Sequence, residues 1–163
     1  MSIRIPRRGT HGVPFPKFPG WLARRMSRAQ LGWFRRRHGG HTQGGLHALI
    51  LETRGARTGE RRTAMLGYLE EPPDSWLVVA SLSGAARNPG WLYNLAKNQD
   101  ATVEFGDGTR VPIRAETVEG QDLKAAWARI AVEAPEYDKY RYKTDREISV
   151  VRLRRRTTIN ESP

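Results

Sequence analysis

The sequence predicts an α+β domain, built as a small antiparallel barrel of about six strands with peripheral helices. Short apolar runs recur along the chain, and turn signals join most of them as hairpins. Helical patterns are inserted between these hairpins and precede the first of them. The 163 residues suffice for one domain with a substantial core.

Six apolar runs define the strands of this barrel. The run at residues 46–52 is continuous, which is typical of a buried strand. Gly106, Asp107 and Gly108 form a hairpin signal between two of the runs. The predicted strands are residues 46–52, 61–69, 76–81, 103–105, 110–114 and 148–153.

Helices are predicted at residues 20–37, 89–97 and 120–134. Pro89 suits the first turn of the second helix, because proline lacks the N–H that this turn leaves unpaired. Leu123, Trp127 and Ile130 give the third helix one apolar face. Residues 1–19 carry four prolines and several glycines, so we expect no regular structure there.

The net charge of +11 is concentrated at the N-terminus. No acidic residue precedes Glu52, whereas ten residues before it are basic. The remainder carries 18 basic and 17 acidic residues and is nearly neutral. We therefore predict three parts: a basic N-terminal extension with an amphipathic helix (1–41), a cofactor-binding barrel domain (42–157) and a tail (158–163).

Several classes of chemistry are excluded by composition. The chain has no cysteine, and therefore no disulfide, thiolate nucleophile or Cys-ligated metal. His38 and His41 flank two glycines without an evident third ligand, so no metal site is predicted. No apolar stretch reaches the length of a membrane span, and the basic N-terminus lacks the apolar region of a secretory signal. We expect a cytoplasmic protein.

Two blocks carry the candidate chemistry. Residues 55–62 form a glycine-bracketed turn with three arginines, which presents backbone N–H groups and guanidinium groups to an anion such as phosphate. Residues 88–95 join aromatic side chains to amide donors at the start of a predicted helix. Together they indicate a site for a flat, anionic cofactor.

These blocks resemble a known family. The Gly-Ala-Arg-Thr-Gly turn, Ala80-Ser81 at a strand end, the Asn-Pro-x-Trp-x-x-Asn-Leu block and the Tyr137-x-x-Tyr140…Thr144-Asp145-Arg146 segment are similar to the deazaflavin-dependent nitroreductases. The resemblance covers residues 46–153, with the motifs in the same order. It implies a split β-barrel like those of flavin reductases and pyridoxamine phosphate oxidases. It also implies hydride transfer from reduced coenzyme F420 to a quinone, a nitro compound or another activated double bond.

The resemblance also assigns residues. It places Arg57 and Arg62 on the coenzyme phosphate and oligoglutamate tail, Ser81 near the deazaflavin ring, and the two tyrosines along the acceptor pocket. The predicted catalytic residues are Tyr137 and Tyr140. The predicted cofactor-binding residues are Arg57, Thr58, Gly59, Arg61, Arg62, Ser81, Asn88, Pro89, Trp91 and Asn94.

The chain departs from the family at two positions. Leu82 follows Ser81 where the best-known members have a lysine, and Ala134 stands where they have another pocket tyrosine. The first departure removes one anion contact, and the second bears on acceptor preference. FMN is the alternative coenzyme, because its single phosphate suits the same turn.

Several assignments have structural alternatives. Arg61 and Arg62 open a strand and should point to opposite faces, so Arg61 is the weaker ligand and is otherwise solvated. Packing is the alternative for Trp91 and for the tyrosine pair, and local backbone bonding is the alternative for Asn94. Asp145 and Arg146 are expected to form an ion pair rather than a catalytic couple.

The basic N-terminal helix has three interpretations. As a membrane-surface helix it would bury its tryptophans among lipid headgroups and place its arginines on anionic lipid, at the inner face of the cell membrane. As a structural element it would pack its apolar side on the barrel. As the arm of a non-catalytic basic module it would bind nucleic acid, which the nearly neutral domain disfavours.

Overall fold

The structure is a computed structural model that describes residues 2–42 and 44–157, and its strands close into a barrel. The order around the barrel is β1-β2-β3-β6-β5-β4, with every neighbouring pair antiparallel. The predicted six-stranded antiparallel split barrel with peripheral helices is confirmed. The strands are β1 (Ala48–Arg54), β2 (Arg61–Glu71), β3 (Ser75–Val79), β4 (Asp100–Glu104), β5 (Arg110–Thr117) and β6 (Val150–Arg155).

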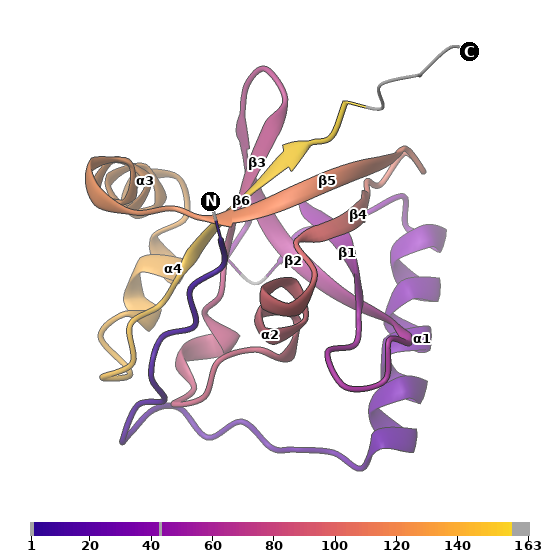
Figure 1. The fold of residues 1–163 in the computed structure, drawn as a ribbon, viewed down its shortest axis with the longest axis horizontal. Coiled ribbons are helices and arrows are strands. Elements are labelled where there is room, and N and C mark those ends of the chain that lie inside the picture. Colours follow the sequence, from indigo (N-terminus) through magenta and orange to yellow (C-terminus); the bar gives the residue numbers. More distant parts are fainter. Residues whose placement is uncertain (1, 43, 158–163) are drawn as a thin grey trace.

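Four helices and one 3-10 turn flank the strands (Figure 1). α1 runs along one side of the barrel, α3 and α4 lie on the opposite side, and α2 lies below the strands in this view. Tyr137 and Tyr140 belong to α4, a short helix that was not separately predicted from the sequence. The elements are α1 (Gly20–Arg36), η1 (Leu82–Gly84), α2 (Gly90–Lys97), α3 (Gly120–Glu133) and α4 (Pro135–Tyr140).

The predicted elements and the observed ones differ mainly at their ends. The first strand was expected from residue 46 but begins at Ala48, because His47 instead forms an isolated bridge with His41. The third strand was expected to reach Ser81 and ends at Val79. Beyond it, Ala80 still donates its N–H to the carbonyl of Ser149 at 2.9 Å, so the chain leaves the barrel gradually.

α2 closes part of the barrel interior. Its buried residues Trp91, Leu92 and Leu95 pack with Leu49 and Leu51 of β1 in one core cluster. α3 packs its buried face on β3 and β6 in a second cluster. The main core therefore fixes the position of the α2 backbone, from which the residues of its outer face project.

The segment before α1 packs against the barrel although it forms no helix or strand. We call residues 2–18 the N-terminal strap. Ile3 and Ile5 contact the barrel core, and the backbone N–H of Arg4 donates to Thr117 Oγ1 at 2.8 Å. In Figure 1 the strap passes down one side and then beneath the molecule to α1. The domain boundary at residue 41 stays a prediction, and the tail at 158–163 lies outside the described residues.

α1 is anchored near its C-terminal end. Phe34 is 1% exposed and packs on Ala48, Ile50 and Met65, which fits the structural interpretation of this helix. Other large apolar side chains of this helix stay exposed, among them Trp21 at 66%. No helix within residues 2–42 and 44–157 is long and apolar enough to cross a bilayer.

Candidate functional site

The predicted anion-binding turn connects β1 to β2. The N–H of Gly55 donates to the carbonyl of Glu60 at 2.7 Å, and the N–H of Gly59 donates to the carbonyl of Gly55 at 2.8 Å. Gly59 has φ +71°, a left-handed conformation that glycine adopts without a steric penalty. Thr58 Oγ1 accepts from the N–H of Glu60 at 3.2 Å. Arg57 is therefore presented from a tightly bonded turn.

Asn94 fastens this turn to α2. Its Oδ1 accepts from the N–H of Ala56 at 2.9 Å, and its Nδ2 donates to Thr53 Oγ1 at 3.0 Å. The alternative expected for Asn94 was bonding to local backbone groups, whereas these two partners lie in β1 and the turn after it. The residue also lines the pocket beside the turn, so a direct role in binding stays a prediction.

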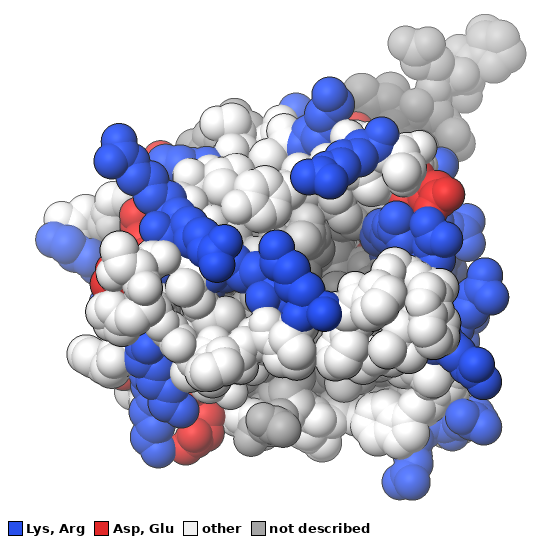
Figure 2. All heavy atoms as spheres, turned by 90° about the horizontal axis from the view of Figure 1, so that it is seen from below, with Lys and Arg blue, Asp and Glu red and all other residues white. Residues whose placement is uncertain are grey.

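A pocket of about 670 Å³ lies between this turn, α2 and the N-terminal strap. We call it the basic pocket, because five cationic side chains from separate parts of the chain line it. Figure 2 shows the underside of the molecule in Figure 1, where Lys and Arg gather across the middle and the few acidic side chains lie toward the edges. The five cations are Arg8, Lys17, Arg57, Arg62 and Arg87.

Most of these cations lack a carboxylate partner. Arg62 lies 3.4 Å from Glu60, and Arg87 donates to the carbonyl of Phe15 at 2.6 Å. Among the described residues, the other three cations have no carboxylate within 4.0 Å. Because like charges repel when no counter-charge separates them, the pocket favours an anion.

Arg61 lies outside the basic pocket, although together with Arg62 it lines a neighbouring hollow between α1 and the start of β2. Its Nε lies 3.2 Å from Glu52 Oε1, and the residue does not line the basic pocket. Gly59 also stays outside the lining, where it shapes the turn. The binding roles predicted for both residues stay predictions.

A second pocket, of about 410 Å³, contains the remaining predicted residues. We call it the tyrosine pocket, after Tyr137 and Tyr140, whose ring centroids lie 5.8 Å apart at 81°. Trp91 is 9% exposed, so it serves both the core and this wall. The predicted residues in this pocket are Ser81, Pro89, Trp91, Tyr137 and Tyr140.

Tyr137 occupies space that two glycines leave free. A Cβ on Gly67 would lie 2.6 Å from Tyr137 Oη, and a Cβ on Gly44 would lie 2.5 Å from its ring. Burial raises the pKa of the Tyr137 hydroxyl above its ordinary value of 10.0. The side chain therefore stays protonated at neutral pH and can act as a hydrogen-bond donor.

The expected ion pair between Asp145 and Arg146 is not formed. Arg146 is 3% exposed, and its guanidinium donates to the carbonyls of Ala80, Ser81 and Ala85 at 2.8–3.1 Å. Burial lowers the pKa of Arg146 from its ordinary value. Asp145 turns outward to the strap, because backbone carbonyls already satisfy the arginine.

Arg146 holds the loop that supplies Ser81 and Asn88. Its Nη1 lies 3.2 Å from Asn88 Oδ1, and Asn88 Nδ2 donates to the carbonyl of Pro6 at 2.8 Å. Asn88 is 3% exposed and lines the basic pocket. Its side-chain amide already forms hydrogen bonds with Arg146 and Pro6. Asn88 connects this loop to the strap, and a direct role in cofactor binding stays a prediction.

The two pockets share one wall. Pro89 and Trp91 face the tyrosine pocket, whereas Gly90, Tyr93 and Asn94 face the basic pocket. All five belong to the first turns of α2 or directly precede it. A ligand with a flat part and an anionic part can therefore occupy both pockets around the start of this helix.

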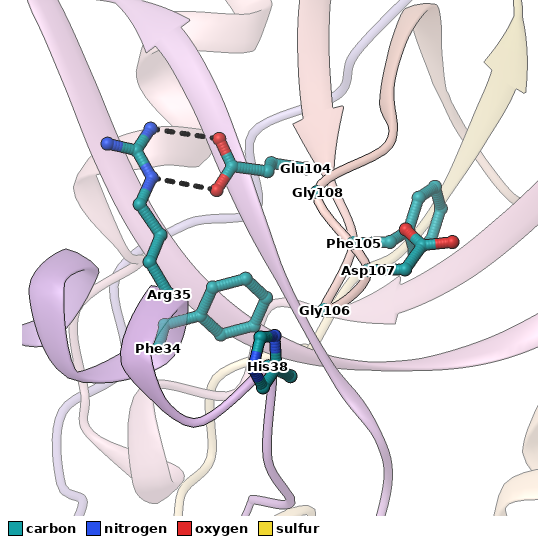
Figure 3. A pocket seen from close by; sticks show the side chains of 8 residues that line it. All are labelled: Phe34, Arg35, His38, Glu104, Phe105, Gly106, Asp107 and Gly108. Carbon is teal, nitrogen blue, oxygen red and sulfur yellow. Dashed lines mark hydrogen bonds and ion pairs between the residues drawn. The ribbon is translucent and has the colours of Figure 1, made fainter.

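A third hollow, of about 350 Å³, lies between the end of α1 and the β4–β5 turn (Figure 3). Arg35 binds Glu104 there through two hydrogen bonds of 2.9 Å. Asp107 accepts from the N–H of Thr109 at 2.9 Å. A Cβ on Gly106 would lie 2.2 Å from the carbonyl oxygen of His38. The Arg35–Glu104 pair and the close backbone contact of Gly106 with His38 join the end of α1 to the β4–β5 turn, so we assign this hollow a structural role.

Sequence reasoning missed several residues of the two pockets. Arg8, Lys17 and Phe15 belong to the strap, which was interpreted as irregular. Arg87 directly precedes the Asn-Pro block. This adjacency is the one sequence signal that could have indicated that Arg87 lines the site. Gly67 lies inside a predicted strand, where an isolated glycine indicates a close approach of another group.

A split barrel with a basic pocket beside an aromatic one is an arrangement that suits a flat cofactor with an anionic tail. The sequence profile of the F420H(2)-dependent quinone reductases matches residues 26–155. An F420H(2)-dependent quinone reductase of Mycobacterium tuberculosis is 38% identical over 112 residues, which are 67% of this chain and 74% of that protein.

Solved structures agree with this match. An F420-H2-dependent reductase, FDR-A, is 31% identical with a TM-score of 0.58, over 65% of this chain and 92% of that one. A domain-swapped dimer is 27% identical with a TM-score of 0.60, over 82% of this chain and 96% of that one. The chain belongs to the F420H(2)-dependent quinone reductase family and is an oxidoreductase that uses reduced F420. The predicted family and coenzyme are confirmed, which favours F420 over FMN.

Proposed function

We propose that the basic pocket binds the anionic tail of F420 and that the tyrosine pocket holds the deazaflavin ring with a quinone acceptor. The observation that carries this proposal is the shared wall at the start of α2. It connects a pocket with five cations to a pocket with two tyrosines. One elongated ligand can then engage both.

The donor set of the basic pocket fits a polyanion. Arginine binds phosphate and carboxylate oxygens through forked, charge-assisted hydrogen bonds, and Arg57, Arg62 and Arg87 offer three such groups. The N-terminus of α2 also faces this pocket through Gly90, and the helix has no side-chain cap there. A helix N-terminus adds favourable electrostatics for an anion.

The tyrosine pocket fits a flat ring with an acceptor beside it. When bound there, reduced F420 supplies the hydride, as the family description implies. Tyr137 is suited to donate a hydrogen bond to the acceptor oxygen, because its hydroxyl is neutral at physiological pH and its pKa is raised further by burial. Trp91 and Pro89 give the pocket a firm apolar wall that helps to exclude water. Nitro compounds stay predicted acceptors beside quinones.

Binding of oxidised F420, followed by quenching of tryptophan fluorescence, tests the site. We expect Arg57→Ala and Arg62→Ala each to weaken binding about tenfold, the scale of one lost charge-assisted contact. Arg61→Ala is the matched control. Arg61 is adjacent to Arg62 in the sequence, but it lies outside the basic pocket and pairs with Glu52. Equal losses in all three variants would overturn the assignment of the basic pocket.

Steady-state kinetics with a quinone test the role of Tyr137. Tyr137→Phe removes the hydroxyl and keeps the ring, so we expect kcat to fall roughly 100-fold while the binding of F420 is unchanged. Tyr142→Phe is the control, because that side chain is 79% exposed and outside the pocket. An unchanged kcat in the first variant would remove the role of hydrogen-bond donor.

We also infer a peripheral membrane contact through α1. Trp21, Met26 and Trp33 are exposed on this helix, and arginines accompany them. Exposed aromatic and basic side chains on one helix suit the headgroup region of anionic lipid. Sedimentation with phosphatidylglycerol vesicles should capture the protein more than phosphatidylcholine vesicles do. A Trp21→Ser/Trp33→Ser variant that sediments equally well would contradict the inference.

A further inference from the structure

The N-terminal strap lies outside the part of the chain that the family profile covers. That profile matches residues 26–155, whereas the strap comprises residues 2–18. Without regular structure, such a segment would ordinarily be a free extension. Its contacts show a different arrangement.

The strap is seated on the loop that connects the two pockets. The N–H of Gly9 donates to the carbonyl of Ala86 at 2.8 Å, and the N–H of Val13 donates to the carbonyl of Gly84 at 2.9 Å. A Cβ on Gly12 would lie 2.5 Å from the backbone nitrogen of Ala86. The backbones of the strap and this loop are therefore in direct contact, with no room for a side chain at Gly12.

Asp145 fixes the middle of the strap. Its carboxylate accepts from the N–H of Thr10 at 2.8 Å, from Thr10 Oγ1 at 2.6 Å and from the N–H of His11 at 3.1 Å. Thr144 Oγ1 donates to the carbonyl of His11 at 2.7 Å. Two adjacent residues of a family-like motif therefore bind a segment that the family profile does not include.

This seating brings strap side chains into both pockets. Arg8 and Lys17 line the basic pocket, and Phe15 lines the tyrosine pocket. Phe15 also receives the 2.6 Å hydrogen bond from Arg87, and its ring centroid lies 5.3 Å from the Arg87 guanidinium carbon. The strap thus crosses from one pocket to the other and supplies two of the five cations.

We propose that the strap is a built part of the coenzyme site, in which Arg8 and Lys17 bind the anionic tail and Phe15 closes the entrance beside the ring. This inference rests on the proposed location of F420. Tail binding and strap seating then support each other, because an anion between Arg8, Lys17 and the Arg57 turn bridges the strap to the barrel.

The test compares two ligands in the full-length protein. One is F420, and the other is the same deazaflavin chromophore without its phosphate and glutamate tail. We expect Arg8→Gln/Lys17→Gln to weaken F420 binding at least tenfold and to leave the tail-less chromophore unchanged. Arg7→Gln/Arg25→Gln removes the same charge from residues outside both pockets and should change neither affinity. Equal losses in the two double variants would overturn the proposal.

The outcomes separate this inference from the proposed function. If Arg57→Ala weakens F420 binding and the strap variant does not, the site stands and the role of the strap fails. If neither variant changes F420 binding, the location of the coenzyme fails first.

Hydrogen exchange provides a readout that does not depend on activity. In the wild type, F420 should slow amide exchange at residues 8–13, whereas the tail-less chromophore should not. Asp145→Asn should speed exchange there without ligand and weaken F420 binding about fivefold. Unchanged strap exchange on addition of F420 would contradict a strap that binds the tail.

Discussion

Two arginine-rich regions of this barrel differ in what surrounds their charges. At the end of α1, Arg35 and Arg110 both bind Glu104, whose side chain is 7% exposed, and we call these three residues the paired cluster. In the basic pocket, Arg57 and Arg8 face a cavity with no carboxylate within 4.0 Å among the described residues. The same residue type therefore forms ion pairs that build structure in one region and leaves positive charge unpaired in the other, according to its counter-charge.

Arg146 is a third case that tests how far this comparison extends, because it has backbone carbonyls as partners. Arg146→Gln leaves buried carbonyls of Ala80, Ser81 and Ala85 without donors. We expect a loss of about 3 kcal/mol in the free energy of unfolding. Urea denaturation measures it, with Arg129→Gln, a partly exposed arginine of α3 that pairs with Glu133, as the control. A loss no larger than that of the control would contradict the structural role of Arg146.

Placing a carboxylate in the basic pocket makes it resemble the paired cluster. Asn94→Asp keeps the acceptor for the N–H of Ala56, replaces the donor to Thr53 Oγ1 with an oxygen to which that hydroxyl can donate, and adds a negative charge to the pocket wall. We expect F420 affinity to fall about tenfold, since a like charge then faces the anionic tail. Asn98→Asp, at the other end of α2, is the control. If Asn94→Asp binds F420 as tightly as Asn98→Asp does, the unpaired positive charge of the pocket does not explain anion binding.

Removing the carboxylate from the paired cluster is the converse change. Glu104→Gln leaves Arg35 and Arg110 without their shared counter-charge. Because both arginines are half-exposed, we expect a stability loss of only about 1 kcal/mol. The binding of F420 should not change, since the cluster lies outside both pockets. Chemical denaturation and the fluorescence titration together check the two outcomes.

Acid should weaken the paired cluster by a smaller amount. Hydrogen bonds from Arg35 hold the pKa of Glu104 below its ordinary value of 4.5. The stabilisation is therefore complete above about pH 4.5 and is lost as pH falls through the lowered pKa. The difference in unfolding free energy between wild type and Glu104→Gln should narrow from pH 6 to pH 3. A constant difference would show that the charge of Glu104 contributes nothing.

The barrel was predictable because its signals are local. Apolar runs, the Gly106–Gly108 hairpin signal and the proline at the start of α2 each depend on neighbouring residues. The strand ends were predicted less accurately. The first strand begins at Ala48 because His47 pairs with His41, a contact outside the apolar run at residues 46–52. Helix and strand periodicity therefore sufficed for the architecture.

The charges of the site were only partly predictable. Arg57 and Arg62 lie in one motif and could be found together, whereas Arg8, Lys17 and Arg87 join them only through the folded strap. The partner of Arg146 was predicted wrongly, because adjacency to Asp145 says nothing about which carbonyls the fold brings near. Counter-charges are set by tertiary contacts, and sequence proximity does not reveal them.

The position of α2 links coenzyme supply to the lifetime of the protein. Trp91, Leu92 and Leu95 fill the barrel interior, while the same helix forms the wall of both pockets. A ligand bound there at 100 times its Kd would add about 2.7 kcal/mol to the folded state. Protease resistance and melting temperature should then rise with F420 concentration, so a cell short of F420 would hold a less durable form of this enzyme.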